Sequence, residues 1–108
     1  MPANMEISID EILRLMVERG ASDLHLKVPA KPVFRIDGEL LPQEDLPTLS
    51  ARDVESIFEQ VTTEEQRASF LRERELDFAY SIPGLARFRV NVLQQRGTMS
   101  LAFRLVPI

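Results

Sequence analysis

The chain has 108 residues, 44% of them hydrophobic, which suits one domain with a modest core. It contains no cysteine and one histidine, which excludes a disulfide framework and any cysteine-based metal site or nucleophile. The 17 acidic and 13 basic residues give a net charge of −4, which argues against a general nucleic-acid binder, and no apolar run is long enough for a membrane span.

The first part of the chain is predicted to form a helix and three short strands. A capping box from Ser8 to Glu11 precedes apolar residues at helical spacing, which predicts a helix at about 9–19. Alternation of apolar and polar residues predicts strands over 22–28 and 33–37. The dipeptide Asp37-Gly38 favours a hairpin, whose second strand follows directly.

Two further helices are predicted in the middle of the chain. Ser50 caps the first, whose apolar residues recur at spacings of three and four and form one inward stripe. A second capping box, from Thr63 to Gln66, opens a more polar helix. We expect Phe70 and Leu71 to anchor this helix to the core.

Alternation from Leu76 to Ile82 predicts another strand, followed by the turn residues Pro83-Gly84. A two-residue loop at this turn would place Phe78 opposite Arg89 and mix the apolar and polar faces. We therefore expect a longer loop or a bulge, and the register of this hairpin stays open.

The segment from Arg87 to Pro107 is predicted to form two strands around a tight turn. Gly97 is the natural turn residue because it tolerates positive φ. If the loop centres on Arg96-Gly97, the numbers of opposite residues sum to 193. Apolar residues then face each other, and Arg89 lies directly opposite Arg104.

Like charges that face each other across a ladder destabilise it, whereas two guanidinium groups can grip phosphate oxygens. This pairing predicts an anion-binding surface. Replacing either arginine by alanine should then leave the stability of the domain unchanged or raise it by about 0.2–1 kcal/mol. The alternative is an ordinary solvated strand face, on which Glu73, Glu75 or Asp77 neutralises the arginines.

These elements predict an α+β domain, with a mostly antiparallel sheet and helices packed on one face. No other residues indicate catalysis or metal binding. His25 has no histidine or cysteine partner, and we interpret it as structural or solvated. None of the four glycines belongs to a phosphate-binding loop, so the chain by itself is not expected to hydrolyse nucleotides.

Several motifs in order resemble the secretion and type IV pilus motor ATPases, and most of all the pilus retraction ATPases of twitching motility. Gly20-Ala21-Ser22-Asp23-Leu24-His25-Leu26 is similar to their G-A-S-D-[LI]-H-[LI] signature, and Arg35-Ile36-Asp37-Gly38 to their R-[IV]-D-G turn. The later stretches that match are Leu76-Asp77-Phe78, Pro83-Gly84-Leu85-Ala86-Arg87-Phe88-Arg89-Val90-Asn91, Gln95-Arg96-Gly97 and Phe103-Arg104-Leu105-Val106-Pro107.

The resemblance implies that residues 1–108 form a single N-terminal PAS-like domain, and that the RecA-like ATPase domain of the family follows beyond the position of Ile108. Family members are cytoplasmic hexamers at the inner-membrane base of the pilus machinery. Their N-terminal domain moves against the ATPase domain of the same or a neighbouring subunit. ATP and Mg²⁺ belong to the full-length protein, and no cofactor is expected in this domain.

The resemblance also implies that arginines of the last strands approach the nucleotide phosphates. This role would belong to Arg89 and Arg104, with Arg96 as a third candidate. The competing interpretation is a free-standing PAS-like module that binds a small ligand or a partner. A weaker interpretation is a nucleic-acid binder that uses the last hairpin, but the net negative charge of the chain argues against it.

Overall fold

The computed structural model describes residues 7–107, which form nine elements of secondary structure around one antiparallel sheet. Their bounds in chain order are α1 (Ile9–Glu18), β1 (Ala21–Leu26), β2 (Val33–Ile36), β3 (Glu39–Pro42), α2 (Ala51–Val61), α3 (Glu64–Glu73), β4 (Glu75–Ile82), β5 (Ala86–Gln95) and β6 (Thr98–Val106). Among these residues, no helix is long and apolar enough to cross a membrane.

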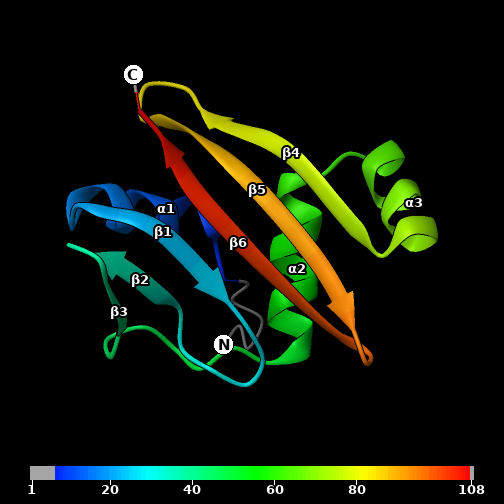
Figure 1. Cartoon of the computed structure of the whole chain (residues 1–108), viewed down its shortest axis with the longest axis horizontal. Coiled ribbons are helices and arrows are strands. Elements are labelled where there is room, and N and C mark those ends of the chain that lie inside the picture. Colours follow the sequence, from blue (N-terminus) through cyan, green and yellow to red (C-terminus); the bar gives the residue numbers. More distant parts are fainter. Residues whose placement is uncertain (1–6, 108) are drawn as a thin grey trace, which may run out of the picture.

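The six strands lie in the order β3-β2-β1-β6-β5-β4, and all five neighbouring pairs are antiparallel. The centre of the sheet therefore joins β1, near the start of the chain, to β6 at its end (Figure 1). The predicted α+β class is confirmed, and the sheet is wholly antiparallel. This contact between sequence-distant strands joins the two halves of the chain in one continuous sheet.

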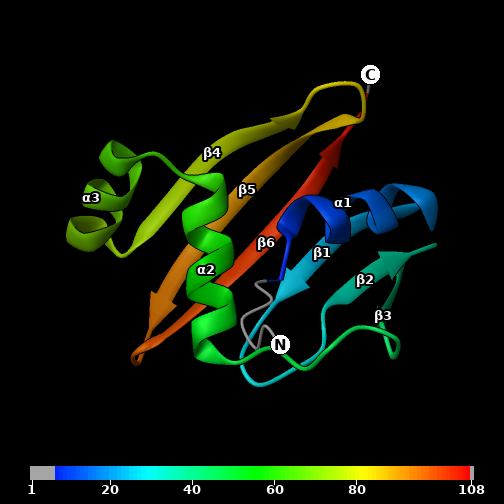
Figure 2. The same cartoon turned by 180° about the vertical axis from the view of Figure 1, so that it is seen from behind.

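Helices α1 and α2 cover one face of the sheet, whereas α3 lies beside the edge strand β4 (Figure 2). The apolar side chains of the strands point to the covered face, because side chains alternate between the two faces. The largest fully buried aromatic side chains are Phe34, Phe88 and Phe103, from three different strands. The core thus lies between the sheet and α1 and α2, and no helix within residues 7–107 covers the opposite face of the sheet (Figure 1).

The hairpin of β5 and β6 has the predicted register. Phe88 pairs with Leu105, Val90 with Phe103, and Arg89 with Arg104. The turn is made by Arg96 and Gly97, both at positive φ (53° and 78°), which matches the twist of a two-residue hairpin.

The hairpin of β4 and β5 has the longer loop that the sequence predicts. Ile82 pairs with Ala86, so three residues form the loop. Phe78 consequently pairs with Val90 rather than Arg89, and the apolar faces of the two strands coincide.

One predicted core contact is wrong. Phe70 of α3 is buried and its ring centroid lies 4.9 Å from that of Phe58 in α2, but Leu71 is 79% exposed. Successive helical residues point about 100° apart, so a helix at the edge of a sheet buries only one of these two neighbours. The predicted ends of the first elements also differ by one or two residues, as at β2, which stops at Ile36 because Asp37 enters the turn with φ of 51°.

Candidate functional site: the open face of the sheet

The candidate site lies on the sheet face opposite to α1 and α2, which we call the open face. Four charged residues stand in one row across it, and we call them the charged row. Arg35 of β2 is opposite Asp23 of β1, and Asp23 is opposite Arg104 of β6. Arg104 is in turn opposite Arg89 of β5. The two arginines predicted from the sequence are therefore neighbours on the open face.

Asp23 is the buried centre of this row. It is only 7% exposed, and its carboxylate accepts hydrogen bonds from Ser22 Oγ at 2.7 Å and Arg104 Nε at 2.9 Å. Arg35 Nε lies 3.6 Å from the same carboxylate. Burial opposes ionisation of Asp23, but the hydrogen bonds from Ser22 and Arg104 and the two positive charges outweigh it and hold its pKa below the usual value. Asp23 is thus a fixed anion that positions Arg104.

The ion pair of Arg89 is of a different kind. Its Nη2 lies 3.3 Å from Asp77 Oδ1, and the two side chains are 62% and 59% exposed. An ion pair this open to solvent holds its partners weakly. Asp77 is one of the three acidic partners that the solvated-face alternative proposed, whereas among residues 7–107 neither Glu73 nor Glu75 forms an ion pair with an arginine of this row.

Sequence reasoning missed the role of Asp23, and this changes one expectation. Removing Arg104 would leave a buried carboxylate without its main partner, so Arg104→Ala should destabilise the domain rather than leave it unchanged. For Arg89→Ala we still expect an unchanged or slightly higher stability, because the ion pair of Arg89 with Asp77 is exposed. No local pattern identifies the Asp23–Arg104 contact, since the two residues are 81 positions apart.

Arg96 does not join the charged row. It lies in the turn of the β5–β6 hairpin, seven positions from Arg89, which corresponds to roughly 20 Å along an extended strand. Of the three predicted arginines, the structure brings together Arg89 and Arg104 and places Arg96 at the far end of the hairpin.

Two hollows open on the same face, on either side of His25. One, of about 290 Å³, adjoins Arg89 and Arg104 and has Ala102 among its lining residues. The other, of about 250 Å³, is lined by basic and apolar side chains that include Lys27, Arg35 and Leu40. Burial is the main cause that lowers the pKa of His25, and the nearby carboxylate of Asp23 only partly opposes it.

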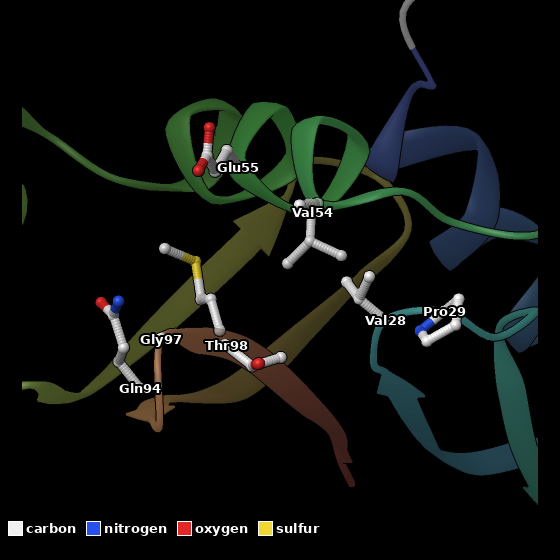
Figure 3. Close-up of a pocket in the computed structure, with 9 residues that line it drawn as sticks. Val28, Pro29, Val54, Glu55, Gln94, Gly97 and Thr98 are labelled. Atoms are coloured by element: carbon white, nitrogen blue, oxygen red, sulfur yellow. The ribbon is translucent and has the colours of Figure 1, made fainter.

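A third hollow lies away from the charged row, between the start of α2 and the tip of the β5–β6 hairpin. It measures about 310 Å³ (Figure 3). Val54 of α2 points towards Val28 across it, and its charged lining residue is Glu55. An acidic, partly apolar lining does not suit an anion. The described residues also contain no group of three acidic, histidine or cysteine side chains that could hold a metal ion.

Comparison with known proteins identifies relatives of nearly the whole chain. The type IV pilus retraction ATPase PilT of Pseudomonas aeruginosa is 36% identical over 94% of this chain, and the type IV pilus ATPase PilU of the same organism is 33% identical over 91%. A crystal structure of the pilus retraction motor PilT with bound ADP superposes with a TM-score of 0.87 at 37% identity, covering 94% of this chain.

The DotB ATPase of Legionella pneumophila shares the fold, with a TM-score of 0.78 at 19% identity over 99% of this chain. In these proteins the match is to the N-terminal region. The chain spans 29% of PilT and 25% of PilU, and 30% of each of the two solved chains. No protein-family model matches the chain.

Proposed function

The chain belongs to the family of type IV pilus retraction ATPases, as the counterpart of their N-terminal domain, and from this premise we propose that it is the regulatory and interaction domain of such a motor. In this role the domain moves against an ATPase domain and presents Arg89 and Arg104 to the phosphates of the bound nucleotide. The 36% sequence identity to PilT, which extends over 94% of the chain, supports the first part of this proposal.

The observation that carries the second part is the pairing of Arg89 with Arg104 on the open face. A fold gains nothing from two guanidinium groups on directly opposed residues of neighbouring strands, because like charges in these positions repel. Both side chains are mostly exposed, at 62% and 75%. Their remaining donors are therefore accessible to an anion, and guanidinium groups bind phosphate oxygens bidentately.

The two arginines differ in how firmly they are held. Arg104 is anchored by the buried Asp23 through Nε, and neither of its terminal nitrogens is hydrogen-bonded to another residue of the described chain. Arg89 touches the exposed Asp77 through one terminal nitrogen. We assign Arg104 the role of a fixed donor and Arg89 that of a mobile one, which exchanges Asp77 for a phosphate as the domain moves.

The partners in this proposal are the ATPase domain of the same or a neighbouring subunit, a homohexameric ring and the inner-membrane pilus machinery. ATP and Mg²⁺ are assigned to the ATPase domain. The domain places positive charge where negative charge accumulates during phosphoryl transfer, and such an arginine can be worth about 10³-fold in turnover. Arg96, remote from the charged row, remains a separate candidate for contact with the nucleotide.

Steady-state ATPase rates of the full-length protein test this function. Arg89→Ala and Arg104→Ala should each reduce turnover by about 10³-fold, as expected for an arginine that stabilises the transferring phosphoryl group. Arg87→Ala is the matched control, because Arg87 is also an exposed arginine of β5, two positions along the strand on the same face. Its turnover should stay within about twofold of wild type.

Two results would contradict the proposal. Turnover that is unchanged in both Arg89→Ala and Arg104→Ala would show that the arginines do not act on the nucleotide. An equal loss of turnover in all three variants would mean that only the overall positive charge of the face matters, and that Arg89 and Arg104 have no specific role. Melting curves of each variant separate loss of activity from loss of folded protein.

A further inference from the structure

The third hollow, of about 310 Å³, opens where the core ends, between the first turns of α2 and the tip of the β5–β6 hairpin (Figure 3). On β5 the side chains of the covered face are apolar as far as Val92, but the next one is Gln94. Gln94 pairs with Met99 of β6, close to the hairpin turn. The hollow therefore lies at the border between the apolar core and the polar tip of the hairpin.

Apolar side chains from three parts of the chain line this hollow. Val28 and Pro29 belong to the connection between β1 and β2, Val54 to α2, and Met99 to β6. The hollow is about ten times the roughly 30 Å³ that one water molecule occupies in the liquid. It therefore has room for an aliphatic side chain.

Three other lining residues carry acceptor oxygens, and these are Glu55, Gln94 and Thr98. Glu55 lies on α2, whereas the other two lie on the hairpin, across from the helix (Figure 3). Within residues 7–107, none of these three side chains forms a hydrogen bond or an ion pair. Their oxygens are therefore free to accept hydrogen bonds from a ligand.

The negative charge at this hollow has no partner in the domain. Glu55 is exposed, and Glu59 follows one turn later on the same helix, where like charges repel. In the described part of the chain, neither Arg52 of α2 nor Arg96 of the hairpin turn forms an ion pair with Glu55. A ligand that brings a positive charge would relieve this repulsion.

An aliphatic chain that ends in a positive charge matches both parts of the lining. A lysine side chain has a stem of four methylene groups and an ammonium group with three N–H donors. The stem can cover Val28 and Met99 while the ammonium stays in solvent beside Glu55, because lysine keeps its charge hydrated when its stem is buried. The acceptors lie on two elements, which suits a compact ammonium better than the planar guanidinium of arginine.

We propose that this hollow is a docking site for a lysine side chain of a partner protein, whose ammonium pairs with Glu55 and donates to Gln94 and Thr98. The docking site is separate from the charged row, because Gln94 and Met99 point to the covered face and the charged row lies on the open face. The domain thus has a second contact surface, to which a basic segment of a partner binds while the open face faces the nucleotide.

Small probes test this site in the 108-residue chain, with the NMR shifts of backbone amides as the readout. The first probe is Nα-acetyl-lysine methylamide. The second carries an acetyl group on the side-chain nitrogen as well, which removes the charge and keeps the stem. We expect millimolar binding of the first probe, with shifts at Glu55, Gly97 and Thr98, and binding of the second that is about fivefold weaker, as for the loss of a solvent-accessible ion pair.

Glu55→Gln removes the charge of the hollow and keeps the shape of the side chain. Glu59→Gln is the matched control, because it makes the same change at an exposed position of α2 outside the lining. Glu55→Gln should weaken binding of the charged probe about fivefold, so that the two probes bind alike. Glu59→Gln should leave the affinity within about twofold.

Several results would overturn the docking site. Equal weakening in the two variants would mean that the probe senses only the overall charge of α2. Equal binding of the two probes to wild type would remove the role of the ammonium, and an absence of shifts around the hollow would remove the site itself. Spermidine is the probe for a free polyamine, and an affinity for it more than about tenfold above that for the lysine probe would assign the hollow to polyamines instead of a partner's lysine.

Discussion

The two faces of the sheet are built from the same strands but are specified in opposite ways. On the covered face, Phe88, Val90 and Phe103 are fully buried beneath α1 and α2. On the open face, the alternate positions of the same strands hold Arg89 and Arg104, which face each other. One face satisfies the requirements of a stable core, and the other contains a pairing that a stable fold would avoid.

The difference shows where function can be sought in a small domain. Residues of the covered face have little freedom to vary, because they fill space between the sheet and the helices. Residues of the open face do not have to fill such a space, so a repulsive pairing of side chains there is better explained by function than by packing. Asp23 is the exception, since it lies on the open face and yet is buried beneath the arginines around it.

The largest effect should come from the covered face. Phe103→Ala should lower the free energy of unfolding by about 3–5 kcal/mol, because it empties the space of a fully buried ring. Ala102→Ser changes the adjacent residue on the open face and should cost less than about 0.5 kcal/mol. Chemical denaturation of the two variants measures both values. A loss below about 1 kcal/mol for Phe103→Ala would show that the core is not where we place it.

Asp23→Asn should have the largest effect among polar residues of the open face. It keeps the shape of the side chain but removes the charge that anchors Arg104, and should lower the free energy of unfolding by about 1–3 kcal/mol. Asp77→Asn is the matched control, because the same change affects only an exposed ion pair and should cost at most about 0.5 kcal/mol. Equal effects would mean that Asp23 is no better anchored than Asp77.

The pH dependence of stability gives a second test of the buried carboxylate of Asp23. Because the pKa of Asp23 is lowered in the folded state, its contribution is present above the unfolded pKa, near 3.9, and is lost as pH falls through the lower folded value. The difference in melting temperature between wild type and Asp23→Asn should thus be constant from pH 8 to 5. Below about pH 4 it should narrow. A difference that stays constant down to pH 2 would contradict the role of the carboxylate.

How much the sequence predicts depends on the distance along the chain. The register of β5 and β6, and with it the Arg89–Arg104 pair, follows from alternation and one turn glycine, because a two-residue hairpin determines its own pairing. The contact of Asp23 with Arg104 requires β1 to lie beside β6, which no local signal specifies. Leu71 was misassigned for a related reason: the apolar pattern of α3 does not show that the helix packs only at the edge of the sheet.

The smallest expected effect tests the central claim, that the pairing of Arg89 with Arg104 does not stabilise the fold. A double-mutant cycle compares the free energy of unfolding of wild type, Arg89→Ala, Arg104→Ala and the double variant. Leaving Asp23 without Arg104 lowers the free energy of unfolding equally in Arg104→Ala and in the double variant. This cost therefore cancels when the coupling energy is calculated. We predict an unfavourable coupling between the two arginines of about 0.2–1 kcal/mol at low salt, which added salt reduces. A favourable coupling would contradict the claim, because the pair would then stabilise the domain that carries it.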